Sequence, residues 1–280
     1  MPLKQRYLSL TLGMLGLGLP LSPVAAAEPQ PDKPSAPQQL PAQVDLRPRL
    51  KDWGLAPRSQ GDRPTCSVFT FTGALEFAVA RARKHGERLS VDFLNWAANQ
   101  TGRGTRDGGL FSEMWDGFAR HGICAEEKMP YGAKFDPARS PGPNARADAK
   151  EKLALGLRLH WVKKWNVKTG LSDDEFARIK RTLNRGWPVC GGFRWPKQAR
   201  WKDHVLQMCQ AKDVFDGHSV LLVGYRDDAG QPGGGTFIFR NTEGDGRDGN
   251  MPYAYARAYM NDAVWVQSEV NPSRTRAAGE

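Results

Sequence analysis

A cysteine, Cys66, stands where the segment SQGDRPTCSVFTFTGALEFAVARARKHG (59–86) passes from polar residues into an apolar run. The apolar positions recur every three to four residues, which predicts a buried helix that begins at Cys66 and ends near Gly86. A thiol at a helix N-terminus lies at the positive end of the helix dipole, which favours the thiolate. Residue type and position fit a nucleophile, although a small residue packed under a loop would fit them too.

A thiolate that attacks an amide needs a base to hold its proton, a group to orient that base, and donors for the oxyanion. His218 in DGHSVLLVGY is the candidate base, because it enters a strongly apolar strand where an imidazole needs a partner. Taken alone, a structural histidine is the more common explanation. The other histidines lie at predicted helix ends (His85, His121) or in polar, irregular segments (His160, His204).

Asn241 follows in TFIFRNTEGDG, at the end of the next predicted strand. An adjacent strand can bring an asparagine side chain beside a histidine ring and fix its tautomer. By itself, an asparagine at a strand end usually serves a turn. Gln60, six residues before Cys66, is the fourth polar residue of interest.

Helices are expected in the first part of the chain, and they must position the thiol. Three more are predicted after the one that begins at Cys66. Ser90 can cap the start of the second helix, and Ser112 can cap the start of the third, which ends at Gly122. Ser172 and Glu175 can form a capping box at the start of the fourth, DEFARIKRTLNR, which ends at Gly186. A loop rich in Pro and Gly, residues 136–146, separates the third from the fourth.

Strands are expected in the second part, and they must position the base. The runs WPVCGGF, HSVLLVGYR, GTFIFRN, PYAYARAYM and DAVWVQ are rich in Val, Phe and Tyr and are separated by turn residues. They predict an antiparallel sheet or barrel. Helices followed by strands indicate an α+β fold with two lobes and a cleft between them: a helical lobe at about 60–135 and a β lobe at about 186–267.

The chain has 280 residues, of which 40% are hydrophobic and 25% charged, as in a globular protein. Residues 1–27 combine two basic residues, a short apolar run and Ala25-Ala26-Ala27, which predicts a secretory signal peptide. A Pro- and Gln-rich linker at 28–43, a domain at 44–267 and a flexible tail at 268–280 are expected to follow. No later apolar run matches the first, so we expect an exported protein, periplasmic or secreted, without stable membrane insertion.

The net charge is +10, or +8 after loss of Lys4 and Arg6 with the leader. A basic surface can favour acidic peptides or anionic envelope polymers, but a solvated surface without a partner is the simpler interpretation. The basic residues are scattered, without the aromatic array of a nucleic-acid groove, so no nucleic-acid partner is expected. The absence of a phosphate-loop or cofactor motif predicts no cofactor and no metal.

The other three cysteines are Cys124, Cys190 and Cys209. No C-x-x-C pair exists, which argues against a zinc cluster. If Cys66 is kept free, at most one disulfide can form within the chain, and Cys190–Cys209 and Cys124–Cys209 both stay open. Five tryptophans are interpreted as core or interface residues: Trp161, Trp165, Trp187, Trp195 and Trp201.

Taken in order, SQGDRPTC, DGG, DGHSVLLVGY and RNTEGDGRDG resemble the landmarks of papain-like cysteine peptidases, and VDLRPR (44–49) resembles their mature N-terminus. The resemblance covers about residues 44–267. It implies a papain-like two-lobe fold and a cysteine-type peptidase that acts on a peptide or protein substrate. Cys66 would be the nucleophile, His218 the base, Asn241 its orienting partner, and Gln60 with the Cys66 backbone N–H the oxyanion hole.

The resemblance also implies substrate-binding residues in the segment after Asp107. Gly108 and Gly109 would let a substrate backbone approach closely, or they form an ordinary turn. Leu110 and Phe111 would line an apolar pocket, or they belong to the core. Only about 16 residues separate the leader from Val44. This is too short for an inhibitory prosegment, so export or a separate protein inhibitor would have to protect the producing cell.

Several positions depart from the family pattern. Arg63 and Arg106 stand where the family has a pair of bridged cysteines, and Glu243 stands where it has a tryptophan that shields the Asn–His contact. Two alternatives therefore stay open: a cell-wall amidase or transpeptidase that uses the same Cys–His pair, and a non-catalytic module that grips an extended peptide.

Overall fold

The computed structural model of the chain describes residues 39–102 and 104–268. The expected signal peptide, most of the expected linker and nearly all of the expected tail lie outside the described residues. A compact unit begins at Leu40. In the part of the chain that is described, no helix has the length and apolar character needed to cross a membrane.

Helices dominate the first part of this unit and strands the second, so the expected α+β layout is confirmed. The helices are α1 (Arg47–Asp52), α2 (Cys66–Arg83), α3 (Val91–Asn99), α4 (Phe111–His121), α5 (Pro143–Leu153), α6 (Asp173–Asn184) and α7 (Tyr253–Tyr259), with short 3-10 turns at Glu126–Lys128 and Ala211–Asp213. The strands are β1 (Gln43–Asp45), β2 (Leu157–Lys163), β3 (Val189–Pro196), β4 (Trp201–Lys202), β5 (Val205–Leu206), β6 (Val214–Asp227), β7 (Gly235–Arg240), β8 (Asp248–Pro252) and β9 (Met260–Ser268).

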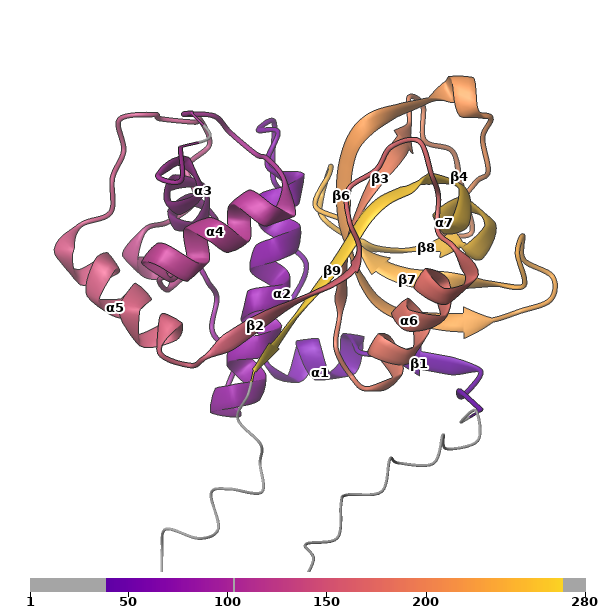
Figure 1. Ribbon diagram of the computed structural model, residues 1–280, viewed down its shortest axis with the longest axis horizontal. Coiled ribbons are helices and arrows are strands. Elements are labelled where there is room, and N and C mark those ends of the chain that lie inside the picture. Colours follow the sequence, from indigo (N-terminus) through magenta and orange to yellow (C-terminus); the bar gives the residue numbers. More distant parts are fainter. Residues whose placement is uncertain (1–38, 103, 269–280) are drawn as a thin grey trace, which may run out of the picture. The chain divides into compact units, whose positions relative to one another are not determined.

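Helices α2 to α5 lie together on one side of the unit, and most of the sheet lies on the other (Figure 1). Helix α2 is buried along nearly its whole length, which agrees with its apolar pattern. The Ser90 hydroxyl caps α3 as predicted, accepting from the Phe93 N–H at 3.0 Å. Helices α3 and α4 come very close at Gly117, where a Cβ would lie 2.4 Å from the Ala98 nitrogen.

The helix predictions needed two corrections. Helix α4 begins one residue before Ser112, and the Glu113 carboxylate accepts from the Leu110 N–H at 2.8 Å, so a side chain inside the first turn replaces the expected cap. Helix α5 begins within the segment 136–146 that was expected to be a loop, because Pro143 at the first helical position is compatible with a helix start. The capping box of Ser172 and Glu175 is present.

The described strands form one nine-stranded sheet in the order β2-β9-β3-β6-β7-β8-β5-β4, with β1 added beside β6. Its pairs are antiparallel except for β5 with β8, which is parallel. Within the described residues the two ends of this order do not pair. The sheet is therefore mixed and open, and not the closed antiparallel barrel that the sequence left possible.

The segment PYAYARAYM was expected to be a strand, and this was wrong: residues Tyr253–Tyr259 form helix α7. Aromatic residues spaced by alanine suit either structure locally. Pro252 ends β8 and caps the helix, and burial of Tyr253, Tyr255, Ala256 and Tyr259 decides the outcome. Tertiary packing overrides the local β-propensity here.

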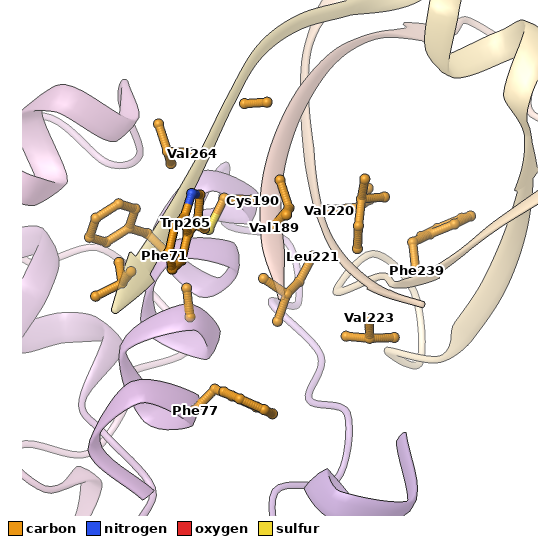
Figure 2. Close-up of a cluster of buried hydrophobic side chains, with 14 of the residues drawn as sticks. Phe71, Phe77, Val189, Cys190, Val220, Leu221, Val223, Phe239, Val264 and Trp265 are labelled. Carbon is orange, nitrogen blue, oxygen red and sulfur yellow. The ribbon is translucent and has the colours of Figure 1, made fainter. Parts of the chain in front are cut away.

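The hydrophobic core joins the helices to the sheet. Figure 2 shows Phe71 and Phe77 of α2 near side chains of three strands, among them Cys190 on β3, Leu221 on β6 and Trp265 on β9. All five are buried. Because apolar burial is the main stabilising contribution to folding, this contact holds α2 in place against the sheet.

Candidate active site

Cys66 is the first residue of α2, as the sequence predicts, and its side chain meets strand β6. The thiol sulfur lies 3.7 Å from the carbonyl oxygen of Gly217. Burial raises the pKa of the Cys66 thiol above its ordinary value, although backbone hydrogen bonds from Ser219 and Ser67 oppose the shift. In the free protein the thiol form is therefore favoured, and position at a helix N-terminus does not by itself produce the thiolate that the sequence suggested.

His218 lies on β6 and Asn241 directly follows β7, so neighbouring strands bring the two side chains together. Histidine Nε2 and asparagine Oδ1 are 2.8 Å apart, and both residues are buried. The Asn241 oxygen also accepts from the backbone N–H of Thr242 at 2.9 Å, which fixes the orientation of the amide. An accepting oxygen requires Nε2 to carry the proton, which leaves the Nδ1 lone pair of the imidazole as the basic site.

A β-bulge in strand β6 sets the direction of the His218 side chain. Phe193 of β3 pairs with His218, but the next residue, Arg194, pairs with Asp216, so Gly217 is skipped. Gly217 has φ +132°, a conformation that only glycine adopts readily. Bulges re-aim neighbouring side chains, and this one turns the Gly217 carbonyl to the thiol of Cys66 while it sets the direction of the histidine.

Trp195 covers the imidazole. Its ring centroid lies 4.6 Å from that of His218, and the indole is 2% exposed. Burial lowers the pKa of His218, while the hydrogen bond to Asn241 and the charge of Glu243 oppose the shift. The tryptophan that shields this histidine thus comes from β3, and the exposed Glu243 follows Asn241 instead. The sequence predicts only a core or interface tryptophan at position 195, because composition does not show that β3 pairs with β6.

Gln60 is tied to the loop that carries Asn241. Its Oε1 accepts from the Thr242 hydroxyl at 2.7 Å, and its backbone N–H donates to the Thr242 carbonyl at 2.8 Å. One N–H of its amide donates to the Arg63 carbonyl at 2.8 Å. The second N–H of this amide has no acceptor among the described residues.

Arg63, which stands where the family resembled has a bridged cysteine, is the centre of a buried ion cluster. Its guanidinium donates two bonds to Asp107, at 2.9 and 2.8 Å, one to Asp92 at 2.7 Å and one to the Gly132 carbonyl at 2.8 Å. Burial alone would lower the pKa of Arg63, but the hydrogen bonds that its guanidinium donates to Asp107 and Asp92 raise the pKa overall. The guanidinium of Arg106 pairs with Glu113.

Neither of the two disulfides that the sequence left open is present among the described residues, where all four cysteines are free. Cys124 and Cys190 are fully buried in different hydrophobic clusters, and Cys209 lies at the edge of the core. Arg63 instead ties the loop before Cys66 to Asp107, which directly precedes the Gly-Gly pair. An ionic cluster thus joins segments that a covalent bridge would otherwise join.

The cavity at the thiol has a volume of about 460 Å³ and is bounded by both the helices and the sheet. Its lining includes Cys66, Ser67, Gly109, Leu110 and Phe111 from the helical side, and Gly192, Phe193, His218, Ser219 and Asp262 from the sheet. Gly108 serves the packing behind it: with φ +77°, a Cβ there would lie 2.2 Å from the Pro64 carbonyl oxygen. The cavity combines an apolar wall with a thiol and an imidazole.

Gly192 and Asp262 contribute to this cavity, and the sequence did not single them out. A Cβ on Gly192 would lie 2.1 Å from a carboxylate oxygen of Asp262. The glycine on β3 thus makes room for the acid on β9. No sequence signal marks the pair, because the two residues meet only through strand pairing.

Among the described residues, no group of three or more His, Cys, Asp or Glu side chains is arranged to hold a metal ion. What the site contains is a thiol, an imidazole whose tautomer is fixed, and amide donors on the adjoining loop. Such an arrangement suits nucleophilic attack on a carbonyl carbon.

The sequence profile of the papain family cysteine proteases matches residues 40–266. The chain therefore belongs to the papain family. It is 27% identical to Cysteine proteinase 3 of Solanum lycopersicum over 191 residues, 66% of this chain and 50% of that relative.

Solved structures show the same fold. Digestive procathepsin L 3 of the Tenebrio molitor larval midgut has a TM-score of 0.62 at 21% identity, covering 82% of this chain and 71% of that one. Xylellain, a cysteine protease from Xylella fastidiosa, has a TM-score of 0.62 at 20% identity, covering 82% and 87%. The chain spans about half the length of the curated relatives that it matches.

Proposed function

We propose that this chain is an exported cysteine peptidase that hydrolyses peptide bonds with Cys66 as nucleophile and His218 as base. The observation that carries the proposal is the 2.8 Å contact between His218 Nε2 and Asn241 Oδ1. It leaves Nδ1 as the basic nitrogen, in a residue that lines the same cavity as the thiol. Membership of the papain family supports this assignment of roles.

In the proposed reaction, His218 Nδ1 takes the thiol proton as the Cys66 sulfur attacks the scissile carbonyl carbon. The carbonyl oxygen becomes an oxyanion, which the Cys66 backbone N–H and the free amide proton of Gln60 stabilise. Collapse breaks the C–N bond, and the imidazolium returns its proton to the leaving amine. Water, deprotonated by Nδ1, then hydrolyses the thioester; the acid is released and the thiol is restored.

Cleavage of internally quenched peptides by the mature protein tests this proposal. Cys66→Ala and His218→Ala should each remove turnover almost completely, because the nucleophile and the base act as a unit. Asn241→Ala should leave partial activity, since the base is retained but its orientation is lost. Full activity of Cys66→Ala would contradict the proposal.

A non-catalytic peptide-binding role is the second candidate, and the raised thiol pKa of Cys66 favours it. A binding module would retain its affinity for peptides in Cys66→Ser and would release no product. A cell-wall amidase or transpeptidase would release wall fragments or transfer products in place of peptide fragments. The same purified protein, incubated with each substrate, separates these three functions.

Export rests on the N-terminal leader in the sequence. The test is N-terminal sequencing of the protein recovered from the periplasm and from the medium. A mature N-terminus after Ala27 is expected. Recovery of the intact leader in the cytoplasm would contradict it.

A further inference from the structure

A second cavity adjoins the catalytic pair on the side of Asn241. Its volume is about 640 Å³, and it lies between the segment 201–204 and the segment 241–249. Its lining consists of Trp201, Asp203, His204, Asn241, Glu243, Gly244, Asp245, Arg247, Asp248 and Gly249. His218 borders the cavity at the thiol, and its partner Asn241 borders this one, so the two cavities flank the His–Asn pair.

The amide of Asn241 is not fully used by the protein. The residue is 7% exposed, and its Oδ1 accepts from His218 and from two backbone N–H groups. Across residues 39–102 and 104–268, its Nδ2 has no hydrogen-bond partner. A buried amide with an unused donor at the cavity border is suited to meet a carbonyl group of a ligand.

The cavity is acidic on a protein that is basic as a whole. Four of its lining residues carry carboxylates, whereas the chain has a net charge of +10. Asp245 pairs with Arg247 at 2.6 Å and Asp248 with Arg240 at 2.9 Å.

The two remaining carboxylates, Asp203 and Glu243, are exposed and form no ion pair within the described residues. They are thus available to a cation that enters the cavity.

The cavity wall is held in place by the sheet. Asp203 and His204 form the two-residue turn between β4 and β5, both with positive φ (51° and 62°), as in the tight hairpin turns that asparagine and aspartate favour. The His204 carbonyl accepts from the Asn250 N–H at 2.9 Å, which fixes this hairpin to β8. Trp201, on the same hairpin, is 44% exposed and offers an indole face beside the carboxylates.

The direction of the reaction assigns this cavity to the leaving segment of the substrate. In the proposed mechanism the acyl part stays bonded to Cys66, and the amine departs after it takes the proton from His218. The residues that follow the scissile bond therefore lie beside His218, whose partner Asn241 borders this second cavity. Carboxylates and an exposed indole together are the groups that attract an ammonium or guanidinium side chain.

Building on the proposed function, we infer that the cavity at Asn241 binds a lysine or arginine side chain from the one or two residues that follow the scissile bond. Asp203 and Glu243 supply the charge, and Trp201 supplies the aromatic wall. The substrates of this peptidase are accordingly those with a basic leaving segment.

The test compares quenched peptides that differ only in having Lys, Gln or Glu at both of the two positions after the scissile bond. kcat/KM should be about tenfold higher for Lys than for Glu, and the ratio should fall as salt rises, because the attraction lies between exposed charges. In the double variant Asp203→Asn, Glu243→Gln the ratio should approach one. The ratio of kcat/KM for the Lys peptide to that for the Glu peptide is compared because any effect of Glu243 on His218 changes the rates for all three peptides alike and cancels in the ratio.

Asp173→Asn is the matched control. Asp173 is also an exposed acid, but it lies at the N-terminus of α6 and pairs with Arg257; the Lys-to-Glu ratio should stay as in the wild type. A wild-type ratio of one, or a ratio unchanged in the double variant, would overturn the inference while peptide cleavage itself still supports the proposed function.

If no peptide is cleaved, the proposed function fails, and binding then tests the cavity separately. Fluorescence anisotropy with Cys66→Ala and the same labelled peptides measures affinity without turnover. Tighter binding of the Lys peptide than the Glu peptide, lost in the double variant, supports the subsite. Equal binding of both peptides overturns it.

Discussion

Replacement of Arg63 by Met should destabilise the protein strongly, because it removes the cation from a buried cluster. Met has a similar length but carries no charge and no hydrogen-bond donor. The change leaves the carboxylates of Asp92 and Asp107, whose side chains are 8% and 7% exposed, without this partner. Four hydrogen bonds from the guanidinium are lost together.

The two carboxylates are affected unequally. Asp92 keeps an ion pair with Arg139 at 2.6 Å, whereas Asp107 keeps the Asn95 amide, which donates at 3.0 Å. The loss of a compensating charge therefore affects mainly the carboxylate of Asp107. Removing one partner of a buried ion pair costs about 3–5 kcal/mol. That is a large part of the roughly 5–15 kcal/mol by which a typical domain is stable.

Urea unfolding at pH 7, followed by tryptophan fluorescence, measures this free energy of unfolding. Arg247→Met is the control: its ion pair with Asp245 is exposed on both sides, so the change should be far smaller. The double variant Arg63→Met, Asp107→Asn should recover part of the loss, because it removes the uncompensated charge. A loss in Arg63→Met no larger than in Arg247→Met, or no recovery in the double variant, would refute the role of buried charge.

Three further predictions concern the site. Burial raises the pKa of the Cys66 thiol and lowers the pKa of His218, so both side chains are neutral in the free protein near pH 7. The rate of Cys66 alkylation should therefore increase with pH, with a midpoint above 8.5, the ordinary thiol pKa. Fast alkylation at pH 5 would contradict this prediction. Trp195→Ala should lower kcat/KM about tenfold and raise the His218 pKa seen in the pH profile, because water then reaches the imidazole. Trp195→Phe should keep most of the wild-type kcat/KM and most of the wild-type pKa. An unchanged pH profile in Trp195→Ala would count against shielding of His218 by this tryptophan. Gly192→Val should raise KM for peptides with a bulky residue before the scissile bond, because a Cβ at this position would lie 2.1 Å from a carboxylate oxygen of Asp262 and would displace that side chain within the cavity wall. Equal KM values for bulky and small residues would argue against that placement.

Much of the local structure follows from the sequence. Cys66 begins a helix because apolar residues recur with helical spacing after a polar loop, and Ser90 and Ser172 mark helix starts because their hydroxyls satisfy backbone N–H groups there. The order of helices and strands indicates the α+β class. His218 lies on β6 and Asn241 directly follows β7, and their contact is predictable because adjacent strands bring such side chains within reach.

The environment of the site was decided only by the tertiary structure. Trp195 shields His218 because β3 pairs with β6, and the bulge at Gly217 aims the imidazole; neither pairing nor register can be read from the spacing of residues. The charge of Arg63 meets Asp92 and Asp107 across segments that are far apart in the chain. Local propensity describes a residue and its near neighbours, whereas burial, strand register and ion pairing depend on which distant segments come together. For that reason the sequence by itself determined which residues could react, and the folded chain determined their protonation, their shielding and the acidic cavity beside them.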